Sequence, residues 1–311
     1  MGLTRSYACR QVSVIIPTRN RAQSLATLLD SLDAANLPAN VALELLIANN
    51  ASTDRTASMV ESRQPKRPQD SLKLVEHPAP GKSRALNRAL AEAHGELLMI
   101  LDDDVSIDAR CIAKHVEAHQ QTDFAAIQGR VLPGKDPEGR GADPKRLREY
   151  NIPIIDYGDQ IMPIRGLTGT NMSFKRQVLE SIGGFDERLG PGASGFSEDT
   201  EFSIRIRKAG FKIGYTPEAI VYHELNPNRY GRAYNRDVEF RKGVSRSMYR
   251  QDSIVFNVIP NLIANCLRWL IYRLLGKTQK VYKTEGRVLK CLGYLAGKFR
   301  RVAGPHAGTE S

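Results

Sequence analysis

Four short, mostly apolar runs lie in the first third of the chain, at residues 12–16, 43–48, 72–75 and 97–101. Apolar residues on both faces of a strand are typical of a parallel sheet that is covered on both sides. The segments between the runs place apolar residues at helical spacing, as at Leu25, Leu28, Leu29 and Leu32, after a possible N-cap at Asn20. This alternation predicts an α/β fold with a mainly parallel, Rossmann-like sheet flanked by helices.

Three adjacent carboxylates, Asp102, Asp103 and Asp104, follow the fourth run directly. Open α/β sheets bind their ligands at the carboxyl ends of the strands, so the triplet lies at the ligand edge. Adjacent acids repel one another and need either solvation or a compensating cation. The triplet therefore indicates a charged ligand site or, alternatively, a solvated turn that precedes a helix.

Two further sets of candidate site residues, an acidic pair and a histidine, lie farther along the chain at the ends of predicted elements. Glu198 and Asp199 begin a predicted helix, 198–209, directly after a glycine-rich stretch, and a helix N-terminus stabilises an anion. His223 ends a short apolar run, and a neutral imidazole can complete a cation site. Each also has a structural alternative, since acids commonly cap helices and a lone histidine is often part of a core.

The net charge of +11 is unevenly distributed. Residues 1–225 carry 28 Lys and Arg against 29 Asp and Glu, whereas residues 226–311 carry 17 against 5. The distribution predicts a nearly neutral domain at 1–225 and a basic helical extension at 226–311. It argues against a basic groove for nucleic acid through the main domain.

The extension contains an amphipathic segment at residues 254–275. Its length nearly spans a bilayer, but Pro260, Arg268 and Arg273 interrupt the apolar run, and a span would place the Lys-rich end contrary to the positive-inside tendency. An interfacial helix on an anionic membrane surface, with Trp269 and Tyr272 at headgroup level, fits the pattern better. The alternative is that the apolar face packs on the main domain.

The cysteine pattern bears on the compartment. Cys9, Cys111, Cys266 and Cys291 are far apart and lack metal-ligand spacing, which favours a reducing compartment. We therefore expect a cytoplasmic protein that is peripheral on the cytoplasmic face of a membrane.

The motifs, in their order along residues 12–224, resemble the family-2 glycosyltransferases, which are nucleotide-sugar-dependent inverting enzymes of GT-A fold. The resemblance lies in residues 14–20, 49–54, 81–87, 101–104, 169–171, 183–187, 198–199 and His223. It implies that Asp199 is the general base and that Asp104 and His223 bind Mg²⁺ or Mn²⁺. The substrate-binding residues it implies are Pro17, Thr18, Arg19, Asn49, Lys82, Asp102, Asp103, Asn171 and Glu198.

The resemblance also implies the substrates, a nucleotide-diphosphate sugar donor and a glycan or lipid-linked acceptor with a free hydroxyl. UDP is the expected nucleotide, although Asn49 stands where the family usually has an aspartate that contacts the base. A sugar-1-phosphate nucleotidyltransferase would need a glycine-rich signature after the first strand, where this chain has 17–20 as Pro-Thr-Arg-Asn. A non-catalytic, membrane-docked scaffold protein of the same fold is the other alternative.

Overall fold

The computed structural model describes residues 7, 9–135, 154–226, 229 and 231–302. These residues form two compact units. The sheet unit comprises the described residues up to Glu187 together with 198–226, and the helical unit comprises 188–197 and the described residues from 229 onward. Whether residue 226 separates two independently folding domains stays a prediction.

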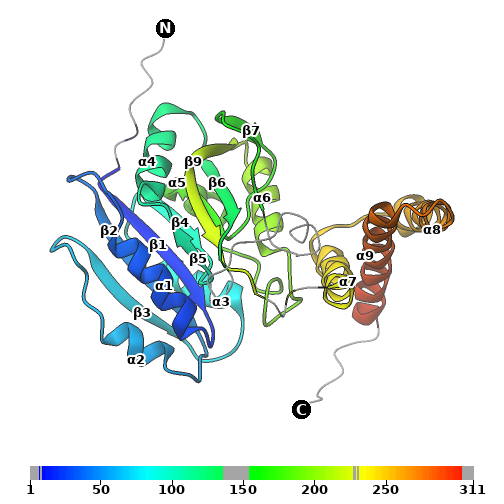
Figure 1. The fold of residues 1–311 in the computed structure, drawn as a ribbon, viewed down its shortest axis with the longest axis horizontal. Helices are drawn as coiled ribbons and strands as arrows, with labels where there is room; N and C mark the ends of the chain where they lie inside the picture. The colour runs from blue at the N-terminus through cyan, green and yellow to red at the C-terminus, as the bar shows by residue number, and fades with distance from the viewer. Residues whose placement is uncertain (1–6, 8, 136–153, 227–228, 230, 303–311) are drawn as a thin grey trace, which may run out of the picture. The chain divides into compact units, whose positions relative to one another are not determined.

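One half of the sheet is parallel, as the apolar runs predict. It contains β3 (Ser71–His77), β2 (Ala42–Asn50), β1 (Gln11–Thr18) and β4 (Leu97–Leu101), in this spatial order. All five residues of β4 are buried, which matches a strand covered on both faces. The carboxyl ends of these strands therefore meet at one edge of the sheet (Figure 1), and residues 102–104 directly follow β4 at this edge.

The other half of the sheet mixes strand directions. β8 (Asn171–Lys175) runs antiparallel to both β4 and β6 (Ala126–Pro133), and β9 (Ile213–His223) runs parallel to β6. The short strands β5 (Val105–Ile107) and β7 (Met162–Ile164) pair antiparallel with β9. The sequence predicts two separate strands at 212–215 and 219–222, but the structure has one strand, because a register shift opposite Gly129 and Arg130 absorbs the irregularity.

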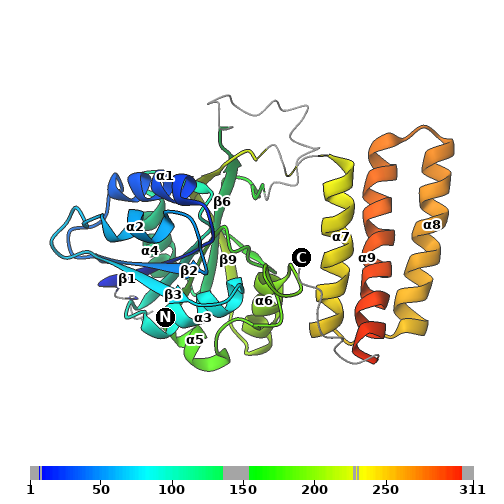
Figure 2. The same cartoon turned by 90° about the horizontal axis from the view of Figure 1, so that it is seen from below.

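Helices cover both faces of the sheet (Figures 1 and 2). One apolar core includes residues of α1 (Ala22–Asp33), α2 (Thr56–Glu61) and α4 (Cys111–Gln121). The opposite core includes residues of α3 (Lys82–Glu92), α5 (Arg176–Ile182) and α6 (Glu198–Lys208). The α/β architecture with flanking helices and C-terminal helices is thus confirmed.

The N-terminus of α1 differs from the sequence prediction. Asn20 does not cap the helix, since it adopts a left-handed backbone with φ 52° and its Oδ1 accepts a hydrogen bond from the Thr53 N–H at 2.7 Å. Asp54 Oδ2 instead accepts from the Ala22 N–H at 3.2 Å. The loops after β1 and β2 therefore satisfy each other's polar groups, and this fixes the backbone around Arg21.

The helical unit contains α7 (Arg232–Tyr249), a π-helical turn η2 (Ile254–Val258), α8 (Ile259–Leu274) and α9 (Thr278–Val302), with α9 between α7 and α8 (Figure 2). Glycines allow α7 and α9 to approach closely. A Cβ at Gly293 would lie 2.0 Å from the Phe240 carbonyl oxygen, and one at Gly243 would lie 2.2 Å from the Lys290 carbonyl oxygen. Ser194 joins the segment 188–197 to α7, since its Oγ lies 2.8 Å from Ser245 Oγ.

Candidate active site

The three aspartates after β4 are compensated by two basic side chains. Lys82 Nζ lies 2.7 Å from Asp102 Oδ1. Arg21 Nη1 lies 3.2 Å from Asp103 Oδ1 and 2.5 Å from Asp104 Oδ2. Because the side chains of Asp103 and Asp104 are only 10% and 7% exposed, the triplet is a largely buried charge cluster and not a solvated turn.

Protonation in the triplet follows from these partners. Burial favours the neutral form of Asp102, but the Lys82 ammonium outweighs burial and lowers the pKa of Asp102 to about 2. Burial raises the pKa of Asp103 to about 7, against the opposing effect of Arg21. Asp102 is therefore an anion near neutral pH, with Thr170 Oγ1 donating to its second oxygen at 2.9 Å.

Lys82 connects the end of β4 with the start of α6. Its Nζ lies 3.4 Å from Glu198 Oε1 in addition to its bond to Asp102. Burial would lower the pKa of Lys82, but the two carboxylates raise it, so the side chain remains an ammonium. The Lys82 ammonium thus connects Asp102, at the end of β4, with Glu198, at the start of α6, in a single site.

Asp199 lies next to this cation. Burial raises the pKa of Asp199, and the Asp102 charge raises it further, while Lys82 and bonds from Thr200 act in the opposite sense. Asp199 Oδ1 accepts from the Thr200 N–H at 2.6 Å. Among the described residues, Asp199 Oδ2 accepts no hydrogen bond, so one oxygen is oriented by the helix start and the other is available.

His223, at the end of β9, faces Asp104. Its Nε2 lies 3.4 Å from Asp104 Oδ1, and its Nδ1 lies 2.8 Å from the Glu224 carbonyl oxygen. A carbonyl oxygen only accepts, so Nδ1 donates to it, and Nε2 is the ring nitrogen that faces the Asp104 carboxylate. A cation could bind between these two atoms, and a hydrogen bond from the second ring nitrogen to a carbonyl oxygen is typical of histidine ligands.

The donor chemistry fits a divalent cation held by two protein ligands. Within the described ranges, no three His, Cys, Asp or Glu side chains are grouped to hold a metal ion by themselves. Mg²⁺ and similar ions are commonly bound by one or two carboxylates together with substrate phosphates, and imidazole is a common metal ligand in proteins. Asp104 and His223 could form such a set of two protein ligands. Among the protein's own groups, Arg21 supplies positive charge beside Asp104.

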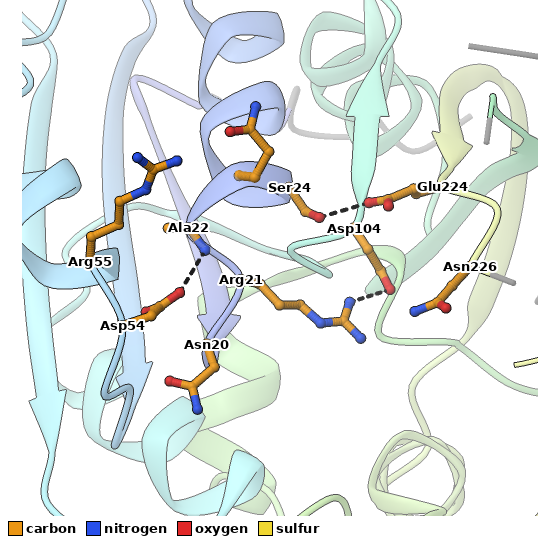
Figure 3. Close-up of a pocket in the computed structure, with 10 residues that line it drawn as sticks. Asn20, Arg21, Ala22, Ser24, Asp54, Arg55, Asp104, Glu224 and Asn226 are labelled. Atoms are coloured by element: carbon orange, nitrogen blue, oxygen red, sulfur yellow. Dashed lines mark hydrogen bonds and ion pairs between the residues drawn. The ribbon is translucent and has the colours of Figure 1, made fainter. Parts of the chain in front are cut away.

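A cavity of about 700 Å³ opens beside Asp104 (Figure 3). Its walls come from the loops after β1, β2, β4 and β9, and the Ser24 hydroxyl donates to Glu224 Oε2 across it at 2.7 Å. The lining is polar and charged, which suits a charged, hydrophilic ligand. The lining residues are Asn20, Arg21, Ala22, Gln23, Ser24, Asp54, Arg55, Asp104, Glu224 and Asn226.

Comparison with known proteins gives the family. A model of glycosyl transferase family 2 matches residues 13–183, which is more than half of the chain. The succinoglycan biosynthesis protein ExoM of Rhizobium meliloti (strain 1021) is 30% identical over 227 residues, covering 72% of this chain and 70% of ExoM. The chain belongs to glycosyl transferase family 2.

Other relatives agree with this family. The probable glycosyltransferase YdaM of Bacillus subtilis (strain 168) is 28% identical over 225 residues, which are 69% of this chain and 50% of YdaM, so the match spans half of that relative. The solved mannosyltransferase PcManGT of Pyrobaculum calidifontis, in complex with GDP-Man and Mn²⁺, has a TM-score of 0.57 at 21% identity, covering 97% of this chain and 77% of PcManGT. That likeness shows a shared fold.

The family resemblance implies a nucleoside site near the ends of β1 and β2. Pro17 and Thr18 end β1 and are buried, and Arg19 follows them with an exposed side chain. The Asn49 amide, at the end of β2, is engaged within the protein, since its Nδ2 donates to both oxygens of Glu76 at 3.0 Å and its Oδ1 accepts from the Ser52 N–H. A carboxylate lies beside position 49, but it belongs to Glu76 on the neighbouring strand β3 and not to residue 49 itself.

Asn171, one of the predicted substrate-binding residues, is fully buried. Its side chain has no exposed surface, and its Nδ2 donates to the carbonyls of Arg130 and Ala219. Its Oδ1 lies 2.9 Å from His115 Nε2. The Asn171 side chain thus links β6, β8, β9 and α4, and its part in substrate binding stays a prediction.

Sequence reasoning did not identify Arg21, Glu76 or Thr170, although all three contact residues of the site. Arg19 and Arg21 both follow β1, and only the left-handed turn at Asn20 determines which one faces the aspartates. Glu76 pairs in register with Asn49 in the sheet, which a pairing of the predicted strands would have revealed. Thr170 lies within the segment 169–171 that carries the family resemblance, so the sequence could have indicated it as a site residue.

Proposed function

We propose that this family-2 glycosyltransferase moves a sugar from a nucleotide-diphosphate sugar to an acceptor hydroxyl with inversion at the anomeric carbon. The observation that carries the proposal is the chain of contacts Asp102–Lys82–Glu198. It joins the strand-end acids to the start of α6, where Asp199 is located. A site that combines buried cations with an oriented carboxylate suits the departure of an anion on one side and the loss of a proton on the other.

Basic side chains of the site would bind the donor diphosphate. Lys82 and Arg21 already hold the aspartates, and a diphosphate would offer them further oxygen partners. For the base we propose uracil. The Glu76 carboxylate, held by Asn49, accepts hydrogen bonds and so favours a base that carries a ring N–H.

Asp104 and His223 would hold Mg²⁺ or Mn²⁺ together with donor phosphate oxygens. When bound, such an ion supplies positive charge that stabilises the departing nucleotide. Arg21 would then share Asp104 with the ion or keep its contact with Asp103.

Asp199 would act as the general base. Its Oδ2 would take the proton of the acceptor hydroxyl while that oxygen bonds to the anomeric carbon and the bond to the phosphate oxygen breaks. The products are the inverted glycoside, the nucleoside diphosphate and a protonated Asp199, which returns its proton to water. The raised pKa of Asp199 makes it a stronger base than an exposed aspartate.

For the acceptor we propose a glycan or a lipid-linked glycan on the cytoplasmic side of a membrane. The likeness to ExoM, a succinoglycan biosynthesis protein, supports a role in building a polysaccharide. All four cysteines are free, which agrees with a reducing compartment.

The test is donor turnover by the full chain with UDP-, GDP-, dTDP- and CDP-linked sugars, with and without Mn²⁺. We expect nucleoside diphosphate release from a UDP-sugar, with water as a slow acceptor, and stimulation by the ion. Binding without any turnover across the panel would favour the scaffold alternative. Pyrophosphate release from a nucleoside triphosphate and a sugar 1-phosphate would favour a nucleotidyltransferase.

A further inference from the structure

Helix α8 and the turn η2 expose their apolar side chains. Within the described residues, the stretch Ile254–Leu274 is the one helix long and apolar enough to cross a membrane, with a mean hydropathy of 1.5, and only 11% of it is buried. Large side chains on its outer face are between 41% and 83% exposed. They are Val255, Phe256, Ile259, Ile263, Leu267, Leu270, Ile271, Leu274 and Leu275. We call this set the outer apolar face.

The opposite side of α8, which packs on α9, is partly polar. Asn265 is only 5% exposed, and its Nδ2 donates to the Asn261 carbonyl oxygen in its own helix. Asn265 Oδ1 and Trp269 Nε1 are buried and have no hydrogen-bond partner in the described structure. A helix that buries amides and exposes leucines has the reverse of the pattern expected in water. The pattern suits a surrounding that is itself apolar.

Positive charge and aromatic rings gather at the end of α8 that leads into α9. Lys277, Lys280 and Lys283 are exposed there, close in sequence to Leu274 and Leu275. The Arg273 guanidinium lies 5.2 Å from the Trp269 ring centroid, and Lys280 Nζ lies 5.3 Å from that of Tyr272. Aromatic and basic side chains together are typical of the headgroup region of an anionic bilayer.

We infer that the helical unit docks on an anionic lipid bilayer, with α8 lying in the plane of the interface and its outer apolar face in the acyl region. This goes beyond the transfer reaction, because it assigns a partner to a surface outside the active site. Spanning is disfavoured since Arg268 and Arg273 are both exposed and would enter the hydrocarbon core. An interfacial helix keeps both charges at headgroup level.

Trp269 is the one tryptophan of the chain and gives a natural depth probe. The full-length protein is mixed with phosphatidylcholine vesicles that contain phosphatidylglycerol, and Trp269 emission is quenched by lipids brominated either near the headgroup or near the bilayer centre. We expect stronger quenching by the shallow bromines and at least tenfold weaker binding to vesicles of phosphatidylcholine alone. Stronger quenching by the deep bromines would overturn the interfacial placement.

A triple variant tests the outer apolar face. Ile263→Glu, Leu267→Glu and Leu270→Glu together should lower vesicle binding at least a hundredfold, because each acid would enter the acyl region. The matched control, Thr27→Glu, Gln177→Glu and Ser181→Glu, adds the same charge at exposed positions of the sheet unit and should change binding less than threefold. Circular dichroism of both variants without vesicles checks that they are folded.

Sedimentation without lipid distinguishes the other possible occupant. If a second copy of the chain covers the outer apolar face, the wild type will sediment as a dimer and the triple variant as a monomer. The lipid assignment is then wrong. Equal vesicle binding by the triple variant and the wild type would also overturn it. Donor turnover by the wild type is measured in parallel in detergent-free buffer, so that failure of the wild type to bind vesicles while its turnover is intact refutes the docking alone.

Discussion

The two units of this protein differ in how they distribute apolar and polar side chains between interior and surface. The sheet unit hides apolar strands such as β4 and pairs its buried charges at one edge, where Lys82 and Arg21 meet the three aspartates. The helical unit hides Asn265 and exposes the outer apolar face. The difference teaches that burial must be interpreted against the surroundings of each unit, which are water for the first and, by our inference, lipid for the second.

Removing Lys82 should affect the site most strongly. Lys82→Met would leave Asp102 and Glu198 buried without their shared cation, so we expect kcat/KM for the donor to fall on the order of a hundredfold, or about 3 kcal/mol. The matched control is Arg84→Met on the same helix, where the side chain is 51% exposed and its contact with Glu187 is 3.7 Å. Steady-state kinetics in which both variants lose activity equally would refute the special role of Lys82.

The close contact of α7 and α9 can be broken selectively. Gly293→Ala would place a Cβ 2.0 Å from the Phe240 carbonyl oxygen and force the helices apart, so unfolding free energy should fall by about 3 kcal/mol. Gly286→Ala, on the same helix, meets only the flexible Glu239 side chain at 3.1 Å and should be nearly neutral. Denaturant unfolding followed by Trp269 emission reports on the helical unit. Equal midpoints for the two variants would contradict the packing described.

His115 and His119 of the sheet unit are buried, and their ring nitrogens, unlike Asn265 Oδ1, have hydrogen-bond partners. Burial lowers the pKa of His115 to about 4, while its two ring nitrogens contact Asn171 and Ser173. The stabilisation due to neutral His115 is therefore fully present above the unfolded pKa of about 6.5. The unfolding free energy should fall by about 3 kcal/mol as the pH is lowered to about 4. Asp103, with a raised pKa, contributes with the opposite sign over part of this range.

The direct check on His115 is an NMR titration of the histidine ring protons. We expect the His115 ring to remain neutral down to about pH 4 and the pKa of the buried His119 ring to lie well below its usual value. Titration of both near pH 6.5 would show that water reaches the pair.

The smallest expected effect separates the two arginines after β1. Arg21→Gln removes the partner of Asp103 and Asp104 and should lower unfolding free energy by about 1–2 kcal/mol, because the Arg21 side chain is 28% exposed and partly screened. Arg19→Gln changes an exposed side chain and should have an effect below about 0.5 kcal/mol. A larger loss for Arg19→Gln in thermal unfolding would contradict the placement of these side chains.

Much of the parallel half of the sheet follows from local pattern. Uninterrupted apolar runs locate β1, β2 and β4, and the topology then places the acids after β4 at the ligand edge. β9 was predicted as two strands, because its irregularity depends on pairing with β6 and not on its own residues. The same limit applies to Asn20, whose side chain bonds to the loop after β2 instead of capping α1.

Side-chain direction was the part that sequence alone could not supply. Arg21, and not Arg19, contacts the aspartates, and the Asn49 amide is bonded to the Glu76 carboxylate on the neighbouring strand. Asn171 belongs to a motif that also includes Thr170, yet only Thr170 contacts Asp102, since neighbouring residues near a strand point to different sides. The segment 188–197 clusters with the C-terminal helices through Ser194, which no local pattern indicates.

The central claim is that Asp199 acts as the general base beside the three aspartates that follow β4. The most direct test is to measure catalysis and donor binding separately in Asp199→Asn. Asp30→Asn, whose side chain is 69% exposed, is the matched control. We predict that kcat falls at least a hundredfold in Asp199→Asn while the donor Kd, from isothermal titration calorimetry, changes less than threefold. An unchanged kcat, or a loss explained wholly by weaker donor binding, would contradict the account.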